Sequence, residues 1–347
     1  MSIELTNLSP REQKVLKYIV FNFIKNASPV GSRLVSKQME PGLSSATIRN
    51  VMSDLEEMEL IKTPYSSSGR IPTDKGYRFY VDMLMNSEDL TEDEKSFLRS
   101  KIEEKKSSLI NSEEVYNEIS KILGKISHQL AIITQPFLST GVFEKLEIIS
   151  LSSSKILVII NITSGFVKTV IMEMDLEISK SKLDKLTIFL NERLQGLTLQ
   201  EIRDTFDIRV SDYKNHEPEL IQLFINSADK LYSDEMNINK IHIGGTGEII
   251  MQPEFDDPKS FKNIIDITED KNLVVHILQN TKIQSNGISI GIGEENIDEK
   301  LKDYSILCST YNIGDTKGNI GIIGPKRINY AKMVSLLNYT SKLISEL

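Results

Sequence analysis

The stretch SSATIRNVMSDLEEMELI, residues 44–61, decides the fold of the N-terminal part of this chain. Ser44 or Ser45 is placed to cap a helix that runs to about Glu59. A helix turns by about 100° per residue, so this segment has two sides. The apolar side carries Ile48, Val51, Met52 and Leu55, with Glu59 on or near it. The opposite, exposed side carries Ala46, Arg49, Asn50 and Ser53.

Charge is distributed unevenly along this helix. Asp54, Glu56, Glu57 and Glu59 crowd its C-terminal half. The helix dipole is already negative at that end, where each acid costs a few tenths of a kcal/mol. Helix stability alone therefore does not explain the order of residues.

The flanking segments complete a recognisable pattern. LSPREQKVLKYIVFNFIKN has Ser9 as a cap, Pro10 at the first helical position and Glu12 three residues after the cap, which predicts a first helix. SPVGSRLVSKQM predicts a short second helix from about Ser32. LIKTPYSSSGRIPTDKGYRFY predicts two short strands around a Ser/Gly loop and then a helix capped by Thr73. Three helices followed by a two-stranded wing indicate a winged helix-turn-helix.

The rest of the chain alternates between the two secondary structures. Residues 88–135 have the apolar spacing of a long connecting helix. Residues 143–174 show β-branched runs typical of an antiparallel meander, and residues 175–280 are mainly helical apart from KIHIGG. Strands return after Lys282 in ISIGIGE, SILCSTYNI and GNIGIIG, and a final amphipathic helix follows. This predicts an α+β fold in which a helical block interrupts a sheet.

Composition limits the function classes. The 347 residues are enough for two or three domains, and no run approaches the ~18 apolar residues that cross a bilayer. The N-terminus carries no export signal, so we expect a cytoplasmic protein without membrane contact. The single cysteine, Cys308, cannot form an internal disulfide, and the four histidines lack metal-ligand spacing. We expect neither a metal nor another cofactor.

The net charge of −8 at first argues against nucleic acid, because phosphate neutralisation supplies most nonspecific affinity for DNA. The charge is not uniform, however. Residues 1–86 hold 11 Lys and Arg against 9 Asp and Glu, a net of +2, whereas the remainder holds 30 against 40, a net of −10. A mildly basic N-terminal part therefore precedes an acidic body.

The residues of the third helix suit DNA recognition. If its N-terminal turns enter a major groove, the positive dipole, Arg49 and Asn50 face the DNA while the acidic end stands away from it. Arginine can bind guanine, and asparagine adenine, through two hydrogen bonds. Alternatively, these two residues form an ordinary solvated face. Arg33 and Lys37 on the second helix are either backbone contacts or solvated cations.

The wing has two interpretations as well. Ser66, Ser67, Ser68 and Gly69 beside Arg70 supply small polar groups suited to phosphate or minor-groove contact. A flexible Ser/Gly hairpin has the same composition. Nearby, Tyr77, Phe79 and Tyr80 are interpreted as core residues rather than as base-stacking ones.

Evidence for catalysis is weak. GGTGE at 244–248 lacks the Gly-Lys-Ser/Thr of a phosphate loop and is interpreted as a turn. Glu294 and Glu295 in GIGEEN are either a general acid with its partner or a charged turn, and the turn is favoured. Cys308 lies in an apolar run that suits a small buried side chain. No catalytic group of residues emerges, so we expect no enzyme.

Several segments of the chain resemble those of a known protein family. LSPREQKVLKYIV, PVGSRLVSKQ, LSSATIRNVMSDLEEMELI and SSSGRIPTDKGYRFYVD resemble the HrcA family of bacterial heat-inducible transcription repressors. The likeness continues in IHIGGTGEIIMQPEF, IGEEN and GNIGIIGPKRINYAKMVSLLNYTSKLISEL and covers nearly the whole chain. Family members usually read IGGTSNLLNQPEF where this chain has Gly247, Glu248, Ile249, Ile250 and Met251.

The resemblance implies a domain plan. A winged helix-turn-helix domain would span residues 1–88, and residues 89–135 would connect it to a GAF-like domain formed by 136–174 and 281–347. Residues 175–280 would be an inserted dimerisation domain.

The resemblance also implies a mechanism. The family's repressors bind an inverted-repeat operator called CIRCE ahead of chaperone operons, as homodimers, and the chaperonin GroEL keeps them active. Together with the residue-level reasoning, this gives the following candidate contacts to double-stranded DNA: Arg33, Ser44, Ser45, Thr47, Arg49, Asn50, Ser53, Ser66, Ser67, Ser68, Gly69 and Arg70. The rival interpretation is a winged-helix regulator controlled by a small molecule in the GAF-like domain.

Overall fold

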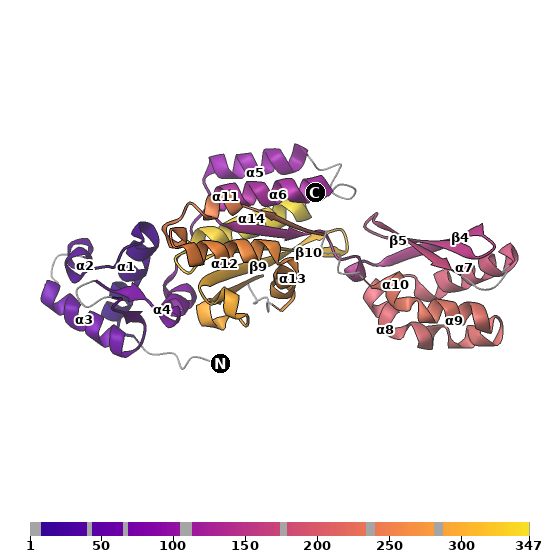
Figure 1. Ribbon diagram of the computed structural model, residues 1–347, viewed down its shortest axis with the longest axis horizontal. Coiled ribbons are helices and arrows are strands. Elements are labelled where there is room, and N and C mark those ends of the chain that lie inside the picture. Colours follow the sequence, from indigo (N-terminus) through magenta and orange to yellow (C-terminus); the bar gives the residue numbers. More distant parts are fainter. Residues whose placement is uncertain are drawn as a thin grey trace.

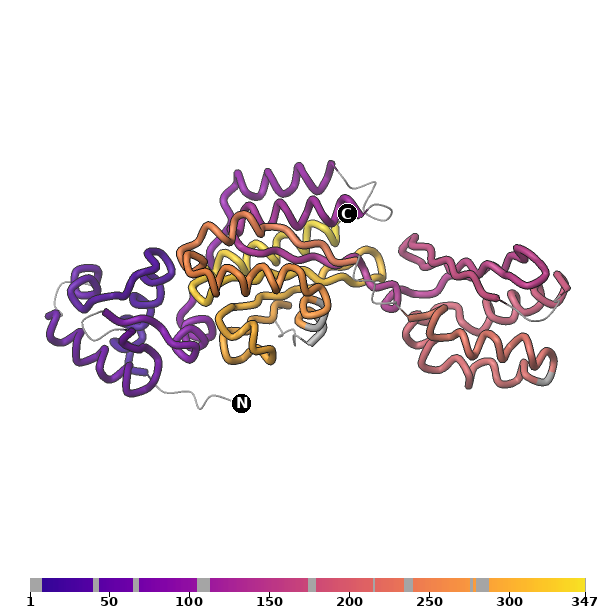
Figure 2. Tube along the Cα trace, in the orientation of Figure 1, coloured from indigo at the N-terminus to yellow at the C-terminus, as the bar shows by residue number. Residues whose placement is uncertain are grey.

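Three units follow one another along an elongated molecule (Figure 1). The computed structural model describes residues 8–39, 44–64, 69–104, 113–173, 179–233, 240–280 and 287–346. We call residues 8–84 the head, residues 143–233 the insert and the remaining described residues the core. The head and the insert lie at opposite ends of the core, as the trace in Figure 2 also shows.

The head begins with the three expected helices. These are α1 (Pro10–Asn26), α2 (Ser32–Gln38) and α3 (Ser45–Glu57). A capping box starts α1, in which the Glu12 amide donates to Ser9 Oγ at 3.3 Å and the Ser9 amide donates to Glu12 Oε2 at 2.6 Å. The apolar stripes of α1 and α3 are buried against each other, which confirms the predicted spacing.

A short ribbon and a fourth helix complete the head. Strands β1 (Ile61–Lys62) and β2 (Ile71–Pro72) pair antiparallel. Helix α4 (Asp74–Phe79) is capped by Thr73, as predicted, and continues into a π-helical turn at Tyr80–Leu84. Tyr77, Phe79 and Tyr80 are buried, which confirms that they belong to the hydrophobic core.

The core is an antiparallel sheet covered by helices on both faces. In the order β7-β3-β10-β9-β8, its strands are β7 (Ile241–Gly244), β3 (Leu130–Thr134), β10 (Thr316–Pro325), β9 (Tyr304–Ile313) and β8 (Ile288–Ile292). One face is covered by α6 (Glu113–Ser127) and α14 (Tyr330–Ser345), and α5 (Glu92–Glu104) packs on these two helices. The other face is covered by α12 (Pro258–Glu269) and α13 (Lys271–Asn280). The head's apolar core is continuous with the α5–α6–α14 layer.

The insert has a hydrophobic core of its own. Its three-stranded sheet consists of β4 (Phe143–Ser152), β5 (Lys155–Ile162) and β6 (Val167–Glu173). Four helices pack on one face of this sheet: α7 (Lys180–Leu194), α8 (Leu199–Arg209), α9 (Pro218–Asn226) and α10 (Ala228–Tyr232). The chain leaves the core after β3 and returns at β7, and these two strands are neighbours in the core sheet. The insert therefore interrupts the core without disturbing its sheet.

The sheets do not follow the boundaries expected from the sequence. Residues 136–174 were expected to share a sheet with 281–347, yet β4–β6 form a separate sheet that packs on α7–α10. Conversely, β7, α12 and α13 lie in the core, although residues 175–280 were expected in the insertion. The reason is that a β-branched run identifies a strand but not the strand with which it will pair, which is a non-local choice.

The expected long connecting helix is also wrong. In the described parts of this segment, 88–104 and 113–135, the chain forms the helices α5 and α6 and the strand β3 rather than an arm between two units. Helix α6 packs on β3 and β7 because its apolar stripe, which includes Ile119 and Leu123, is buried. This segment is part of the core. In the described part of the chain, no helix is both long and apolar enough to cross a membrane.

Candidate nucleic-acid interface

Helix α3 begins with a side-chain cap. Ser44 Oγ accepts a hydrogen bond from the Thr47 amide at 3.1 Å and lies 3.0 Å from Thr47 Oγ1. Ser45 Oγ lies 3.4 Å from Ser32 Oγ at the start of α2, so two hydroxyls join the N-terminal ends of the two helices. Three of the small hydroxyls expected at this end therefore hold the local structure.

The two sides of α3 are as the sequence predicts. Ile48, Val51, Met52 and Leu55 are buried. Ala46, Arg49, Asn50 and Ser53 are exposed. The helix ends at Glu57, and Glu59 is exposed with a positive φ of 61°, so the expectation that Glu59 lies near the buried side is wrong. The chain has already turned out of the helix at that point.

Three arginines from different elements line one groove of about 340 Å³ on the head. Arg33 comes from the first turn of α2, Arg49 from the middle of α3, and Arg70 from the base of the ribbon. Gly69 lines the same groove and packs against the backbone of Val30. The groove thus brings together four of the candidate residues, Arg33, Arg49, Gly69 and Arg70. The candidates Ser44, Ser45, Thr47, Asn50 and Ser53 do not line it.

Arg70 is held in place by the acidic end of α3. Its Nη2 lies 2.9 Å from Glu56 Oε2, and the Thr63 hydroxyl donates to Glu56 Oε1 at 2.6 Å. The backbones of Arg70 and Val30 also exchange two hydrogen bonds of 2.9 Å. One of the four carboxylates that make α3 lopsided thus fixes the ribbon against the helix. The candidates Ser66, Ser67 and Ser68 lie outside the described residues.

The other motifs have structural roles. In GGTGE the chain turns at Gly245, between β7 and the short helix α11 (Thr246–Ile249), so the expected turn is only this residue. The turn packs on α6, because a Cβ on Gly124 would lie 2.4 Å from Gly245 Cα. Cys308 is buried in β9, as expected. Within the described ranges, no three His, Cys, Asp or Glu side chains gather as a metal site would require.

The two glutamates of GIGEEN are held in ion pairs. Both occur in a short 3₁₀ turn, Gly293–Glu295, which agrees with the favoured interpretation. Glu294 lies 3.0 Å from Lys302 Nζ, and Glu295 faces the guanidinium of Arg78 in the head. Local sequence patterns do not predict this contact, although Arg78 and the two glutamates all fall in motifs that carry the family resemblance.

Comparisons with known proteins agree with this architecture. The family described as HrcA protein C terminal domain matches residues 113–334. The heat-inducible transcription repressor HrcA of Chlorobium phaeobacteroides (strain BS1) is 39% identical, with 98% of each chain covered. The repressor of the same name from Chlorobaculum tepidum is 42% identical, with 98% of this chain and 97% of that one covered.

The fold is similar to that of a solved protein. A crystal structure described as that of a hypothetical protein at 2.2 Å resolution aligns over 98% of both chains, with 22% identity and a TM-score of 0.57. That likeness concerns the fold alone. The family match and the relatives at 39% and 42% identity carry the assignment. They show that this chain belongs to the HrcA family of heat-inducible transcription repressors, which are not enzymes.

Proposed function

We propose that the head is a winged helix that reads double-stranded DNA with α3 in the major groove. The observation that carries this proposal is the groove in which Arg33, Arg49 and Arg70 meet beside the exposed side of α3. Major grooves admit a helix, and guanidinium groups bind both phosphates and guanine. Arg49 and Asn50 are the base readers in this proposal, whereas Arg33 and the ribbon contact the backbone.

We propose further that the repressor binds as a homodimer to an inverted repeat, the CIRCE operator of its family. One helix reads only a few base pairs, so a twofold protein on a twofold site increases specificity. The insert offers a surface for such a dimer. The face of β4–β6 away from the helices carries four exposed aliphatic side chains: Ile149 (43%), Leu151 (52%), Val167 (53%) and Ile171 (53%).

Two of these side chains, Ile149 and Ile171, belong to one apolar row. Ile149 pairs with Leu157, and Leu157 pairs with Ile171, so the three form a row across the sheet. Contiguous apolar surface of this kind marks interaction sites in soluble proteins. We call it the insert face, and we propose that it packs against the same face of a second copy.

We also propose that activity depends on the chaperonin GroEL, which the family resemblance supports. A repressor that partly populates a poorly folded state gains active molecules when a chaperonin refolds them. Heat-damaged proteins compete for GroEL, so repression then weakens and the chaperone genes are released. We propose, finally, that the core is the GAF-like domain that the family resemblance implies.

Fluorescence anisotropy with an inverted-repeat operator and a scrambled duplex tests DNA reading. We expect wild-type protein to prefer the operator and Arg49→Ala to lose about 5- to 150-fold of that preference, the equivalent of ~1 to 3 kcal/mol for one bidentate base contact. Arg33→Ala should weaken binding to both duplexes equally and lower the slope of log affinity against log salt by about 1.

The control variant is Arg11→Ala, which removes an exposed arginine of α1 that does not line the groove. It should leave both affinities unchanged. Equal, weak binding of wild-type protein to both duplexes, with and without GroEL, would contradict sequence reading by this head.

A further inference from the structure

The head and the core meet through a set of directional polar contacts, which we call the joint. It joins Asp74 and Arg78 of α4 and the end of α1 to the core turn 293–295, Glu254 and the segment Lys326–Arg327. Arg78 is its centre and is only 8% exposed. Its Nε donates to Glu295 Oε1 at 2.8 Å, and its Nη2 donates to Glu295 Oε2 at 2.5 Å and to the Ile290 carbonyl at 2.6 Å.

The Arg78 side chain keeps its positive charge in this position. Burial by itself lowers the pKa of Arg78, but the hydrogen bonds and negative charge of Glu295 outweigh burial, with a smaller contribution from Asp82, and the net effect raises the pKa. A guanidinium that binds both oxygens of one carboxylate also fixes their relative orientation. Arg78 therefore constrains the angle between α4 and the core turn.

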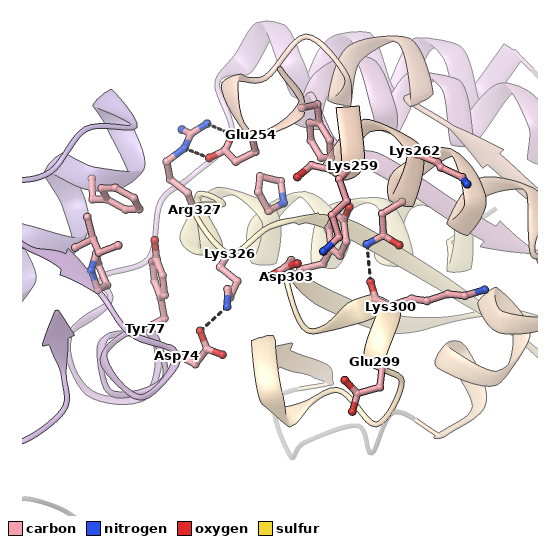
Figure 3. A pocket seen from close by; sticks show the side chains of 18 of the residues that line it. Asp74, Tyr77, Glu254, Lys259, Lys262, Glu299, Lys300, Asp303, Lys326 and Arg327 are labelled. Atoms are coloured by element: carbon pink, nitrogen blue, oxygen red, sulfur yellow. Dashed lines mark hydrogen bonds and ion pairs between the residues drawn. The ribbon is translucent and has the colours of Figure 1, made fainter. Parts of the chain in front are cut away.

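Asp74 provides a second constraint on the same helix. Its Oδ2 accepts from the Glu294 amide at 3.0 Å, and its Oδ1 lies 2.8 Å from Lys326 Nζ, as Figure 3 shows for the ion pair. The core turn is shaped for this approach, because a Cβ on Gly293 would lie 1.9 Å from Asp74 Oδ2. Only glycine permits this contact.

Arg327 of the core forms a third constraint, on α1. Its Nη1 donates to the Ile24 carbonyl at 2.7 Å, in the last turn of that helix. Its Nε and Nη2 bind Glu254 at 2.5 Å and 2.9 Å (Figure 3). The side chain thus connects the head to a core residue far from α4 in the sequence.

Beside the joint lies a cleft of about 840 Å³ that residues of both units line. The rings of Tyr77, in the head, and Tyr330, in the core, lie 5.9 Å apart and belong to the hydrophobic core that the two units share. Apolar contact holds the two units together, whereas the polar contacts select one angle between them.

The groove of three arginines is not part of the joint. In Figures 1 and 2, α2 and α3 lie on the side of the head that faces away from the core. The joint therefore leaves the groove open and determines the direction in which it faces.

We propose that the joint sets the spacing of the DNA half-sites that the repressor accepts. This inference rests on the proposed function, namely a dimer that reads an inverted repeat. With the angle fixed, the two heads of a dimer meet their half-sites at one separation, as the spacing of a palindromic site requires. Arg78, Asp74 and Glu295 are positioning residues for specificity and touch no DNA.

The variant of choice is Glu295→Gln, which keeps the size of the side chain and removes its charge. Lys326→Met loosens the joint independently through Asp74 and keeps the test available if the first variant folds poorly. Glu192→Gln is the control, because it makes the same chemical change at an exposed residue of α7, on the other side of the insert sheet from the insert face.

Two measurements are made on each protein. The first is the affinity for operators whose spacer between half-sites is changed one base pair at a time, together with the affinity for a single half-site. The second is single-molecule energy transfer between dyes on Arg11→Cys in the head and Lys342→Cys in the core, with labelled protein diluted into unlabelled protein.

Loosening the joint should flatten the spacing preference by on the order of tenfold, with half-site affinity unchanged. The energy-transfer distribution should broaden without DNA. The control Glu192→Gln should change neither the spacing preference nor the energy-transfer distribution. A sharp spacing optimum in both joint variants, or an unchanged energy-transfer distribution, would overturn the proposal. If wild-type protein prefers the operator over scrambled DNA equally at every spacing, the proposal for the joint is overturned but the proposed function stands. If wild-type protein shows no preference for the operator, the proposed function is overturned as well.

Discussion

At the scale of single residues, Gly293 is a position where one added methyl group reports directly on the joint. Its φ is +55°, a conformation that other residues rarely adopt, and a Cβ would collide with the Asp74 carboxylate. We expect Gly293→Ala to lower the free energy of unfolding by about 2 to 4 kcal/mol, from backbone strain and a lost charged hydrogen bond. The urea midpoint of the transition that includes head and core measures this.

Two other glycines separate these causes. Gly196 has a φ of +82° and no atom within 4 Å of the added Cβ, so Gly196→Ala measures backbone strain alone, about 1 kcal/mol. Gly247 is helical and has open space around it, so Gly247→Ala should be neutral or stabilising by up to ~1 kcal/mol. If Gly293→Ala costs no more than Gly196→Ala, Asp74 moves aside freely and the joint is softer than its contacts indicate.

At the scale of elements, the N-terminus of α3 serves both stability and the proposed DNA contact. Ser44→Ala removes the acceptor for the Thr47 amide and should cost about 1 kcal/mol in thermal unfolding. Ser44→Asp keeps an acceptor there and adds a charge that suits the helix dipole, so it should retain wild-type stability. Its DNA affinity should nevertheless fall about fivefold, because the new carboxylate would repel a nearby DNA phosphate. Two like unit charges 4 Å apart in water repel each other by ~1 kcal/mol.

The salt dependence of this loss distinguishes its cause. Repulsion between the carboxylate that Ser44→Asp introduces and a phosphate should weaken as ionic strength rises, whereas a misplaced helix would bind poorly at any salt concentration. Unchanged affinity of Ser44→Asp at low salt would show that this end of α3 does not approach the DNA backbone.

Elements with local signals were predictable from the sequence. The capping box at Ser9 and Glu12 defined the start of α1, and the spacing of Ile48 and Leu55 defined the buried side of α3. The same spacing placed Arg49 and Asn50 on the exposed side, because the period of a helix determines which neighbouring residues share a face.

Pairings over long distances were not predictable. The runs that form β4–β6 have the same β-branched composition as the strands of the core, so nothing local excluded them from that sheet. Arg78 and Glu295 are 217 residues apart, and each alone is an ordinary charged residue. Their contact, like the pairing of Arg70 with Glu56 across the ribbon, depends on how complete elements pack.

At the scale of the whole molecule, head and insert lie at opposite ends, so a dimer through the insert face leaves both heads free to meet DNA (Figure 1). We expect Ile171→Lys or Ile149→Lys to convert the dimer to a monomer in sedimentation velocity, because a charge at either end of the row would be buried without a partner. Both side chains are about half exposed within one chain, so neither substitution should destabilise the fold of the monomer itself. The melting temperature should fall only by the stabilisation that dimerisation had contributed.

Ile208→Lys is the matched control, since Ile208 is 77% exposed but lies on α8, away from the insert face. It should remain a dimer. The monomeric variants should bind a single half-site as tightly as wild type while losing the gain from joining two heads, which for linked sites is ~10²- to 10⁴-fold. An intact dimer in both Ile149→Lys and Ile171→Lys would place the twofold contact on another surface. Loss of half-site affinity together with the dimer would mean instead that the head depends on dimerisation for its fold.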